Sequence, residues 1–379
     1  MKTLDTLHTL PDLILAAKQR LPSHVWDFII GGGESETTVK RNRLALDSLA
    51  LRPEILRDVS RIDTTATLLG HPLRFPIVLS PMGSVGMIDE QAALGPTLAA
   101  SELDLLTFFS GVADPGPESV IRSASCPVIY TLIVRDGRKW LDALLDQICE
   151  LGFAGIAMLA DNAYYARRDR DLINKTASKV VRTTSYSEIQ ALAEQGTPPE
   201  QQDASMHSAK LTWDTLSYIK KRTGLPVVLK GVTSGRDATR ALDNGTDVIY
   251  VSNTGGRQLD HQPGTVDVLP EVVSAVAGKA EVIVDGGFMR GTDIIKALAL
   301  GANAVGMGRL QALALGAAGK EGLLRALSIV EEELVINMGL LGVTRIDEIN
   351  ETYLRSVAPV NSSHPLSAFP VVMERLGLS

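Results

Sequence analysis

The sequence predicts an α/β fold: a (β/α)8 barrel with an N-terminal helical extension and a loop insertion after the fourth strand. Short apolar runs rich in β-branched residues recur along the chain. They are continuous rather than alternating, as in strands that are buried on both faces. Helical stretches lie between these runs, and eight strands that alternate with helices are typical of a closed parallel barrel. An open, doubly wound sheet is the alternative, but no GxGxxG motif follows the first predicted strand.

The predicted elements follow one another in a regular order. The strands are Pro76–Pro81, Leu105–Ser110, Pro127–Ile133, Gly155–Asp161, Pro226–Val232, Asp247–Asn253, Glu281–Gly287 and Ala304–Arg309. The helices predicted between them are Trp140–Leu151, Thr212–Thr223, Gly235–Asn244, Thr265–Val276 and Thr292–Leu300. Two more helical stretches, Gly322–Met338 and Val360–Leu378, are expected to close the barrel.

Two segments stand outside this alternation of strands and helices. Residues 1–75 include a helical start, Asp12–Arg20, and a break at Gly31–Gly33, and we expect them to cover the bottom or the lip of the barrel. Residues 175–210, after the fourth strand, are polar, so they form either a lid over an active site or a surface excursion. We therefore interpret residues 1–379 as one domain with an extension and an insertion.

The composition excludes some classes of protein. The chain has 37 basic and 44 acidic residues, and this acidic excess argues against a nucleic-acid partner. Its two cysteines, Cys126 and Cys149, cannot form a disulfide framework, which fits a cytoplasmic protein. The N-terminus lacks the apolar core of a secretory signal. The most apolar stretch, 297–319, is interrupted by polar residues, so a buried strand between two helices explains it better than a membrane span. We expect neither a membrane partner nor a metal site.

Candidate functional residues gather at the ends of the predicted strands, the face of a barrel that carries the active site. Glycines follow or flank the last two strands, at 286, 287, 291, 306 and 308. Loops at these places commonly bind phosphate through backbone N–H groups and a helix N-terminus. Arg309 would add a bidentate contact to that anion. The alternative is that close packing of helix against strand requires these glycines.

Three further groups have a specific chemical use. Lys230, within a buried strand, is expected to point into the barrel mouth, where it would stabilise an anion such as a reduced flavin or form a Schiff base. Arg257 lies in the segment Ser252–Asp260 and either binds a carboxylate or pairs with Asp260 in a structural turn. Asp161 ends the fourth strand and is either a helix cap or part of the site.

The sequence resembles the FMN-dependent 2-hydroxy acid oxidase and dehydrogenase family, which includes glycolate oxidase, lactate oxidase and mandelate dehydrogenase. The similarity extends from about Leu21 to Ile349. It is carried by the stretches LPSHVWDFIIGGG, RPEILRDVS, SPMG, GFAGIAMLAD, LTWDTLSYIKKRTGLPVVLKGV, VSNTGGRQLD, DGGFMRGTDIIKALALGA and GMGR. The resemblance implies FMN as the cofactor, a small-molecule substrate and a homo-oligomer, as a tetramer. It leaves the electron acceptor open between oxygen, a quinone and another molecule.

The resemblance also implies where FMN is held. The backbone of Pro81, Met82 and Gly83 would lie along the flavin, and Lys230 would face N1 of the ring and stabilise its anionic reduced form. Met289 stands where the family has arginine, so phosphate binding is expected to depend more on Arg309 and the adjacent Arg290. The remaining implied contacts to ring, ribityl chain and phosphate come from Ser110, Thr131, Leu159, Ser252, Asp285, Gly286, Gly287 and Gly308.

The departures from the family lie on the substrate side. Thr254 replaces the histidine that the family uses as a base, and threonine has no basic group near neutral pH. Phe28 and Ile133 replace two active-site tyrosines. The catalytic residues are predicted as Thr254, Asp161, Arg257 and Lys230, and the substrate-binding residues as Phe28, Ile133, Arg168, Thr254 and Arg257.

These departures favour an FMN-dependent oxidoreductase that passes hydride from a substrate C–H bond to flavin N5. Its donor would be atypical for the family: an alcohol, an amine or a modified acid. The proton would go to Asp161, His261, Tyr164 or Tyr165, or would leave without an external base. The alternatives are an ordinary 2-hydroxy acid oxidase or dehydrogenase that uses another base, a non-catalytic FMN-binding protein, and a Schiff-base aldolase that uses Lys230.

Overall fold

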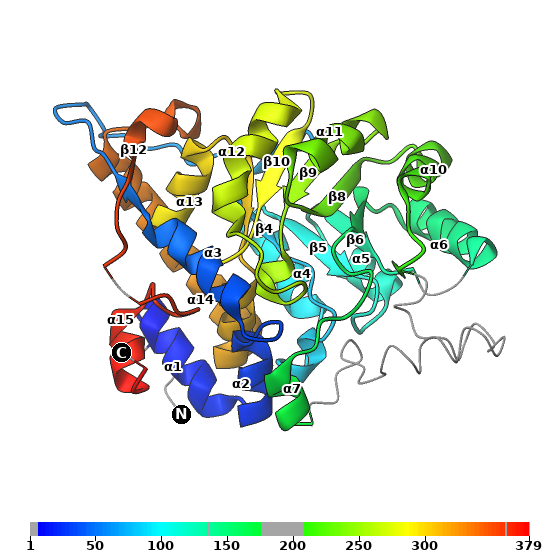
Figure 1. The fold of residues 1–379 in the computed structure, drawn as a ribbon, viewed down its shortest axis with the longest axis horizontal. Helices are drawn as coiled ribbons and strands as arrows, with labels where there is room; N and C mark the ends of the chain where they lie inside the picture. Colours follow the sequence, from blue (N-terminus) through cyan, green and yellow to red (C-terminus); the bar gives the residue numbers. More distant parts are fainter. Residues whose placement is uncertain (1–6, 135–136, 176–207, 361, 379) are drawn as a thin grey trace.

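The predicted barrel is confirmed by a computed structural model, which describes residues 7–134, 137–175, 208–360 and 362–378 (Figure 1). Eight parallel strands close in the order β10-β11-β4-β5-β6-β7-β8-β9. They are β4 (Ile77–Leu79), β5 (Leu106–Ser110), β6 (Val128–Leu132), β7 (Gly155–Leu159), β8 (Val227–Val232), β9 (Val248–Val251), β10 (Glu281–Val284) and β11 (Ala304–Gly306).

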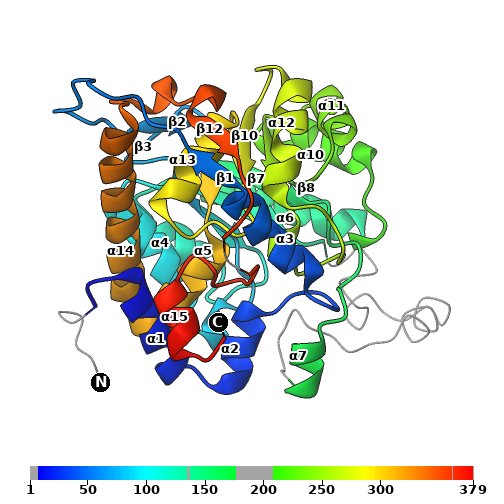
Figure 2. The same cartoon turned by 60° about the vertical axis from the view of Figure 1, so that its left-hand side comes forward.

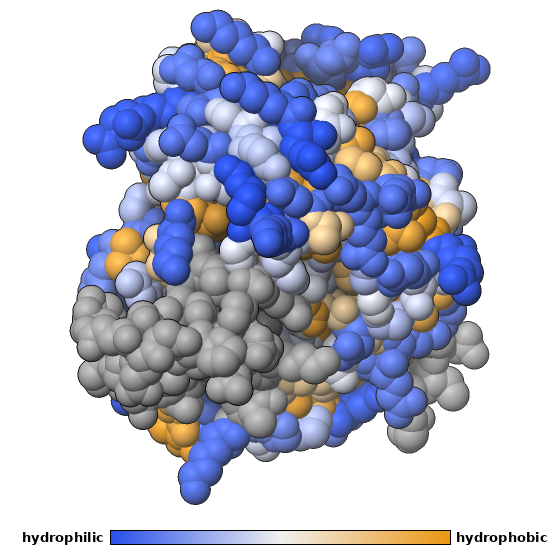
Figure 3. Space-filling model, turned by 90° about the vertical axis from the view of Figure 1, so that its right-hand side faces the viewer, coloured by the Kyte–Doolittle hydropathy of each residue, from blue (hydrophilic) through white to orange (hydrophobic). Residues whose placement is uncertain are grey.

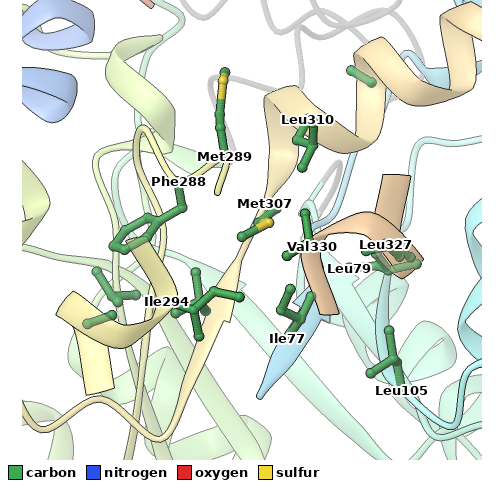
Figure 4. Packing of buried hydrophobic residues seen from close by; sticks show 14 of the residues in the cluster. Ile77, Leu79, Leu105, Phe288, Met289, Ile294, Met307, Leu310, Leu327 and Val330 are labelled. Carbon is green, nitrogen blue, oxygen red and sulfur yellow. The ribbon is translucent and has the colours of Figure 1, made fainter. Parts of the chain in front are cut away.

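Both faces of the barrel sheet are buried, which is why its strands read as continuous apolar runs. The side chains inside the barrel form one cluster, which includes Phe108, Val228 and Tyr250. The outward side chains pack against the surrounding helices. Figure 4 shows this second layer where Ile77, Leu79, Met307, Leu310 and Val330 meet. With both faces filled, polar groups are concentrated where the strands end.

Helices surround the barrel and follow its strands in sequence (Figures 1 and 2). They are α4 (Leu94–Glu102), α5 (Pro117–Ser123), α6 (Arg138–Leu151), α7 (Asp169–Ile173), α10 (Trp213–Thr223), α11 (Gly235–Asp243), α12 (Thr265–Val276), α13 (Gly291–Ala299) and α14 (Gly308–Leu341). The long α14 bends where Ala318 and Gly319 leave helical geometry. The apolar stretch 297–319 contributes the end of α13, β11 and the start of α14, as predicted.

The N-terminal extension covers both ends of the barrel. A hairpin of β2 (Ala66–Leu68) and β3 (His71–Leu73) places Leu68 and Leu73 in the inner cluster at the amino ends of the strands. At the opposite end lie α2 (Ser23–Ile30) and α3 (Thr37–Asp47), the latter packed against the short 3-10 helix η4 (Thr254–Gly256). The extension also contains α1 (Leu10–Arg20), packed on α14, and β1 (Leu49–Leu51), which pairs antiparallel with β12 (Leu354–Ser356).

A buried ion pair fixes α3 over the mouth of the barrel. Arg43 donates to Asp293 at 2.8 and 2.9 Å and to the carbonyl of Gly287 at 3.0 Å. Arg43 also bonds Asp47 one turn along α3. Since Asp293 lies in the first turn of α13, this pair ties the extension directly to the loop that follows β10.

The C-terminal stretch is less helical than the sequence predicts. Val360–Leu378 is helical only as α15 (Pro370–Arg375), so its prediction as one helix was wrong. Pro365 and Pro370 explain this, because proline can begin a helix but cannot continue one. The predicted lid or surface excursion at 175–210 falls on residues 176–207, which lie outside the described residues.

The described surface is mostly hydrophilic on the face drawn in Figure 3, where apolar residues occur in small groups. Among the described residues, no helix combines the length and apolar character that crossing a membrane requires. No group of three or more His, Cys, Asp or Glu in that part of the chain is arranged to hold a metal ion.

Candidate active site

A cavity of about 1300 Å³, its open mouth included, lies at the carboxyl ends of the barrel strands. The sequence-predicted residues that line it are Phe28, Pro81, Met82, Gly83, Ser110, Thr131, Ile133, Leu159, Arg168, Lys230, Thr254, Arg257, Asp285, Gly286, Gly287, Met289, Gly308 and Arg309. Of the residues assigned to catalysis, substrate binding or cofactor binding, Asp161, Ser252 and Arg290 do not line it.

Lys230 forms a buried polar cluster at the mouth of the barrel. Its ammonium donates to Ser252 Oγ at 2.5 Å and to Asp285 Oδ2 at 2.6 Å, and the Ser252 hydroxyl donates to Asp285 Oδ1 at 2.6 Å. The ring of Tyr250 lies beneath, with its centre 4.2 Å from Lys230 Nζ. A buried ammonium held against a carboxylate in this way is a fixed positive group that faces the cavity.

Thr254 and Asp161 lie on the substrate side of that cluster. Thr254 has a φ of 49°, a left-handed conformation that is uncommon for a β-branched residue. Its N–H donates to Ser252 Oγ at 3.0 Å, and its hydroxyl donates to Asp161 Oδ2 at 2.6 Å. Asp161 Oδ1 is buried and has no hydrogen-bond partner among the described residues.

The environment of Asp161 strengthens its affinity for a proton. Burial raises the pKa of this carboxyl, and the Lys230 ammonium and the hydrogen bond from Thr254 oppose the rise only in part. The nearby carboxylate of Asp285 raises the pKa further. A carboxylate with increased basicity is therefore hydrogen-bonded to Thr254, a residue that lines the cavity.

Arg257 and Arg168 give one end of the cavity a positive charge. Arg257 donates to the carbonyls of Phe28 and Gly31 at 2.5 and 3.1 Å, and its guanidinium lies 4.5 Å from the centre of the Phe28 ring. Arg168 donates to the carbonyl of Arg257 at 3.0 Å. Burial lowers the pKa of Arg257 well below its usual value, and the neighbouring Arg168 and Arg309 lower it further. An anionic ligand would relieve this repulsion.

The structure does not pair Arg257 with Asp260, the alternative left open by the sequence. Asp260 instead accepts hydrogen bonds from Ser35 and from the backbone N–H groups of Thr37 and Thr38. The carboxylate of Asp260 thus anchors the start of α3. Arg257 is left facing the cavity, where it lies close to the end of α2.

The predicted phosphate end of the cavity is built mainly from backbone. Gly286 and Gly287 have φ values of 106° and 87°, and a Cβ atom on Gly286 would lie 2.6 Å from Thr265 Oγ1, so only glycine fits there. Gly308 begins α14, whose N-terminus offers backbone N–H groups to an anion. Met289 is fully buried in the apolar cluster shown in Figure 4.

The two arginines expected to hold phosphate have different surroundings. Arg290 does not line the cavity, and its guanidinium pairs with Glu333 at 2.6 Å. Arg309 lines the cavity and donates to the carbonyls of Ile29, Gly31 and Gly255. Burial lowers the pKa of Arg309 to about 10, which again favours an anion nearby.

Comparison with known proteins identifies the family to which this site belongs. The family model described as FMN-dependent dehydrogenase matches residues 17–356. The chain belongs to the FMN-dependent dehydrogenase family. It is therefore an oxidoreductase, and its cofactor is FMN.

Curated relatives in this family are similar along almost their whole length. An L-lactate oxidase of Nostoc sp. is 34% identical over 347 residues, which cover 89% of this chain and 95% of the relative. Glycolate oxidase 1 of Oryza sativa subsp. japonica is 35% identical over 342 residues, 89% of this chain and 93% of the relative.

Solved structures of the family have the same fold. A mandelate oxidase with (S)-2-phenylpropionate has a TM-score of 0.82 at 31% identity, covering 94% of this chain and 100% of the other. A soluble mutant of the membrane-associated (S)-mandelate dehydrogenase of Pseudomonas putida has a TM-score of 0.83 at 28% identity. The match covers 93% of this chain and 100% of the other. Another mandelate oxidase structure, a mutant with the C4a-OH-FMN adduct, has a TM-score of 0.79 at 31% identity. The match covers 92% of this chain and 100% of the other.

The residues present fit FMN at this place. Thr131 is fully buried, and its hydroxyl has no partner among the described residues although it lines the cavity. A buried hydroxyl without a partner is costly, and a polar atom of the flavin ring would satisfy it. Ser110 and Lys230 add further polar groups around the same space, while Gly287, Gly308 and Arg309 suit the phosphate.

Sequence reasoning missed the apolar part of the lining. Val85, Ile88 and Val112 come from the segments that follow β4 and β5, and single aliphatic residues in such segments have no chemical signature. Of the residues considered as replacement bases, Tyr165 lines the cavity, whereas Tyr164 and His261 do not. The His261 side chain is 66% exposed, beside Ser35 on the surface.

Proposed function

We propose that this family member oxidises a donor C–H bond by passing hydride to N5 of FMN, and that the donor is an alcohol, an amine or a modified acid rather than a simple 2-hydroxy acid. One observation carries the proposal. The cavity presents Phe28, Ile133 and Thr254 on its substrate side, and no imidazole lines it among the described residues.

The loss of these groups has a physical cost for hydroxy acid oxidation. A well-placed general base typically contributes about 10²–10⁴-fold to the rate, and Thr254 alone has no comparable proton affinity. Phe28 and Ile133 have no hydroxyl to donate to a carboxylate, so part of the usual recognition of an acid is missing. The side chains that remain suit a larger or more apolar donor.

The other residues of the cavity keep clear roles. Bound FMN supplies the hydride acceptor. The Lys230 ammonium, held by Asp285, would stabilise the negative charge that the ring gains on reduction. Arg168 and Arg257 would hold an anionic group of the donor, and the apolar residues Met82 and Leu159 would help to exclude water from the cavity.

A second candidate has support from the relatives. Lactate and glycolate oxidases share about a third of this sequence, which favours an ordinary 2-hydroxy acid enzyme that uses another base. Anaerobic mixing of the holoenzyme with lactate, glycolate, (S)-mandelate, benzyl alcohol and benzylamine separates the candidates. We expect the alcohol or the amine to bleach the flavin fastest. Fastest bleaching by a 2-hydroxy acid would establish the second candidate. Failure of every donor to reduce a tightly bound FMN would indicate a non-catalytic FMN-binding protein.

A further inference from the structure

Thr254 is held in a strained position by two specific hydrogen bonds. A β-branched residue with φ near 49° is sterically disfavoured, and such strain persists only where the surroundings enforce it. Here Ser252 Oγ accepts from the backbone N–H of Thr254, and Asp161 Oδ2 accepts from its hydroxyl. Both contacts hold Thr254, which lines the cavity, in a fixed position.

Asp161 is fixed behind Thr254 and is not neutralised by an ion pair. Gly231 of β8 has a φ of 104°, and a Cβ atom there would lie 2.9 Å from Asp161 Cβ, so backbone packs closely against this side chain. Lys230, the cation that lowers the pKa of Asp161, is already held by Asp285 and Ser252. No salt bridge to Asp161 occurs among the described residues, and its Oδ1 has no partner there.

We propose that Thr254 and Asp161 form a proton relay that replaces a histidine base: Thr254 Oγ1 takes the donor's proton while its own hydroxyl proton passes to Asp161 Oδ2. The relay rests on the proposed function and deepens it. It uses the direction of the hydrogen bond, because a hydroxyl that donates to Asp161 keeps lone pairs to accept an O–H or N–H from the cavity.

The step balances in atoms and electrons. The donor's C–H bond breaks and its electron pair moves with the hydrogen to N5 of the oxidised flavin. The O–H or N–H bond of the donor breaks, its proton goes to Thr254 Oγ1, and a C=O or C=N bond forms. Asp161 ends the step protonated. The donor carbon is oxidised by two electrons, FMN is the oxidant, and Asp161 later returns the proton to solvent.

The relay predicts a definite pH dependence. Asp161 must be ionised to accept the proton, so flavin reduction falls as the pH falls through the pKa of Asp161. Burial raises that pKa, the facing Lys230 ammonium and Thr254 hydroxyl lower it, and the Asp285 carboxylate raises it. Removing the Thr254 hydroxyl therefore raises the pKa of Asp161 further, because a hydrogen bond that favours the ionised form is lost.

The first test reads the carboxyl directly and needs no donor. Infrared spectra of the holoenzyme are recorded against pH, and the band that disappears in Asp161→Asn is assigned to Asp161. We expect this band to titrate above the ordinary range of aspartate, to shift upward in Thr254→Val and to stay in place in Thr254→Ser, which keeps the hydroxyl. A band that titrates identically in Thr254→Val and in wild type would overturn the relay.

The second test measures flavin reduction by (S)-mandelate, 2-phenylglycine and benzyl alcohol under anaerobic conditions. With the fastest of these donors, Thr254→Val and Asp161→Asn should lose about 10²–10⁴-fold and Thr254→Ser should stay within a few-fold of wild type. FMN content and unfolding curves identify variants that merely misfold. Equal rates in wild type and Thr254→Val would reject the relay. Failure of all three donors with wild type would count against the proposed function alone, since the infrared titration still decides the relay.

Discussion

Substitutions in the Lys230–Asp285 pair should change the stability of the fold and the rate of flavin reduction separately. The two charged atoms lie 2.6 Å apart, and the side chains are only 5% and 10% exposed. Lys230→Met removes the ammonium and leaves a carboxylate in a nearly closed space. Breaking a buried pair on one side typically costs about 3–5 kcal/mol, because a buried charge is left without compensation. Since Asp285 borders the open cavity, water reaches it, and we expect the lower end of that range.

The matched control is the double variant Lys230→Met/Asp285→Asn. It removes both charges, while the amide oxygen introduced in place of the carboxylate can still accept from Ser252, so most of the lost stability should return. Flavin reduction should not return, because no ammonium remains beside the ring. Urea unfolding is measured for the apoprotein and at saturating FMN, since bound cofactor adds its own stabilisation. A loss below about 1 kcal/mol in Lys230→Met, or no recovery in the double variant, would refute the assignment of this pair as a buried ion pair.

Three further outcomes follow from other parts of the molecule. Gly306→Ala drives a Cβ atom into the hydroxyl of Tyr250, so thermal unfolding should show a loss of about 1–3 kcal/mol that Tyr250→Phe partly restores; additive effects of the two changes would contradict this contact. Burial alone would raise the pKa of Asp293, but the Arg43 guanidinium holds this pKa below its ordinary value of 3.8. The ionised form is thus favoured by folding, and the stability it contributes is present above pH 3.8 and lost as pH falls through the lowered pKa. The difference in free energy of unfolding between wild type and Asp293→Asn should therefore become smaller as the pH falls. A difference that does not change with pH would argue against this role of Asp293. Because an imidazole has a higher proton affinity than the Thr254 hydroxyl, Thr254→His should raise the rate of flavin reduction by (S)-mandelate above that of wild type; no gain in a variant that folds and binds FMN would show that proton removal does not limit this substrate.

The barrel was predictable from the sequence because burial of both sheet faces leaves unbroken apolar runs. The strand ends were less so: the run Gly155–Asp161 was predicted whole, yet β7 ends at Leu159, where the chain turns into a loop. The helix content of Val360–Leu378 was overestimated because the prediction followed its apolar residues and not the two prolines at 365 and 370. The sequence could not predict that the N-terminal extension covers both ends of the barrel. That placement depends on contacts between distant residues, such as the hydrogen bond from Leu69 N–H to the Glu281 carboxylate.

The site was predictable where a residue type alone implies a role. Lys230 in an apolar strand and the glycines at 286 and 287 belong to this class, and the structure brings them to one cavity. The partners of the arginines were not predictable. Arg290 pairs with Glu333, which lies 43 residues later in the chain. Arg309 donates to backbone carbonyls of α2 and η4, and no pattern of side chains indicates such contacts. The orientation of the Thr254 hydroxyl toward Asp161 likewise required the three-dimensional placement of two strand ends.

Anaerobic rapid mixing shows which class of donor reduces the flavin fastest. The holoenzyme is mixed with (S)-mandelate, 2-phenylglycine and benzyl alcohol, which differ only in the groups bonded to the reacting benzylic carbon, and the loss of oxidised flavin absorbance is followed. We expect the amine or the alcohol to reduce the flavin faster than mandelate does. Faster reduction by mandelate, at a rate that Thr254→His does not improve, would contradict it.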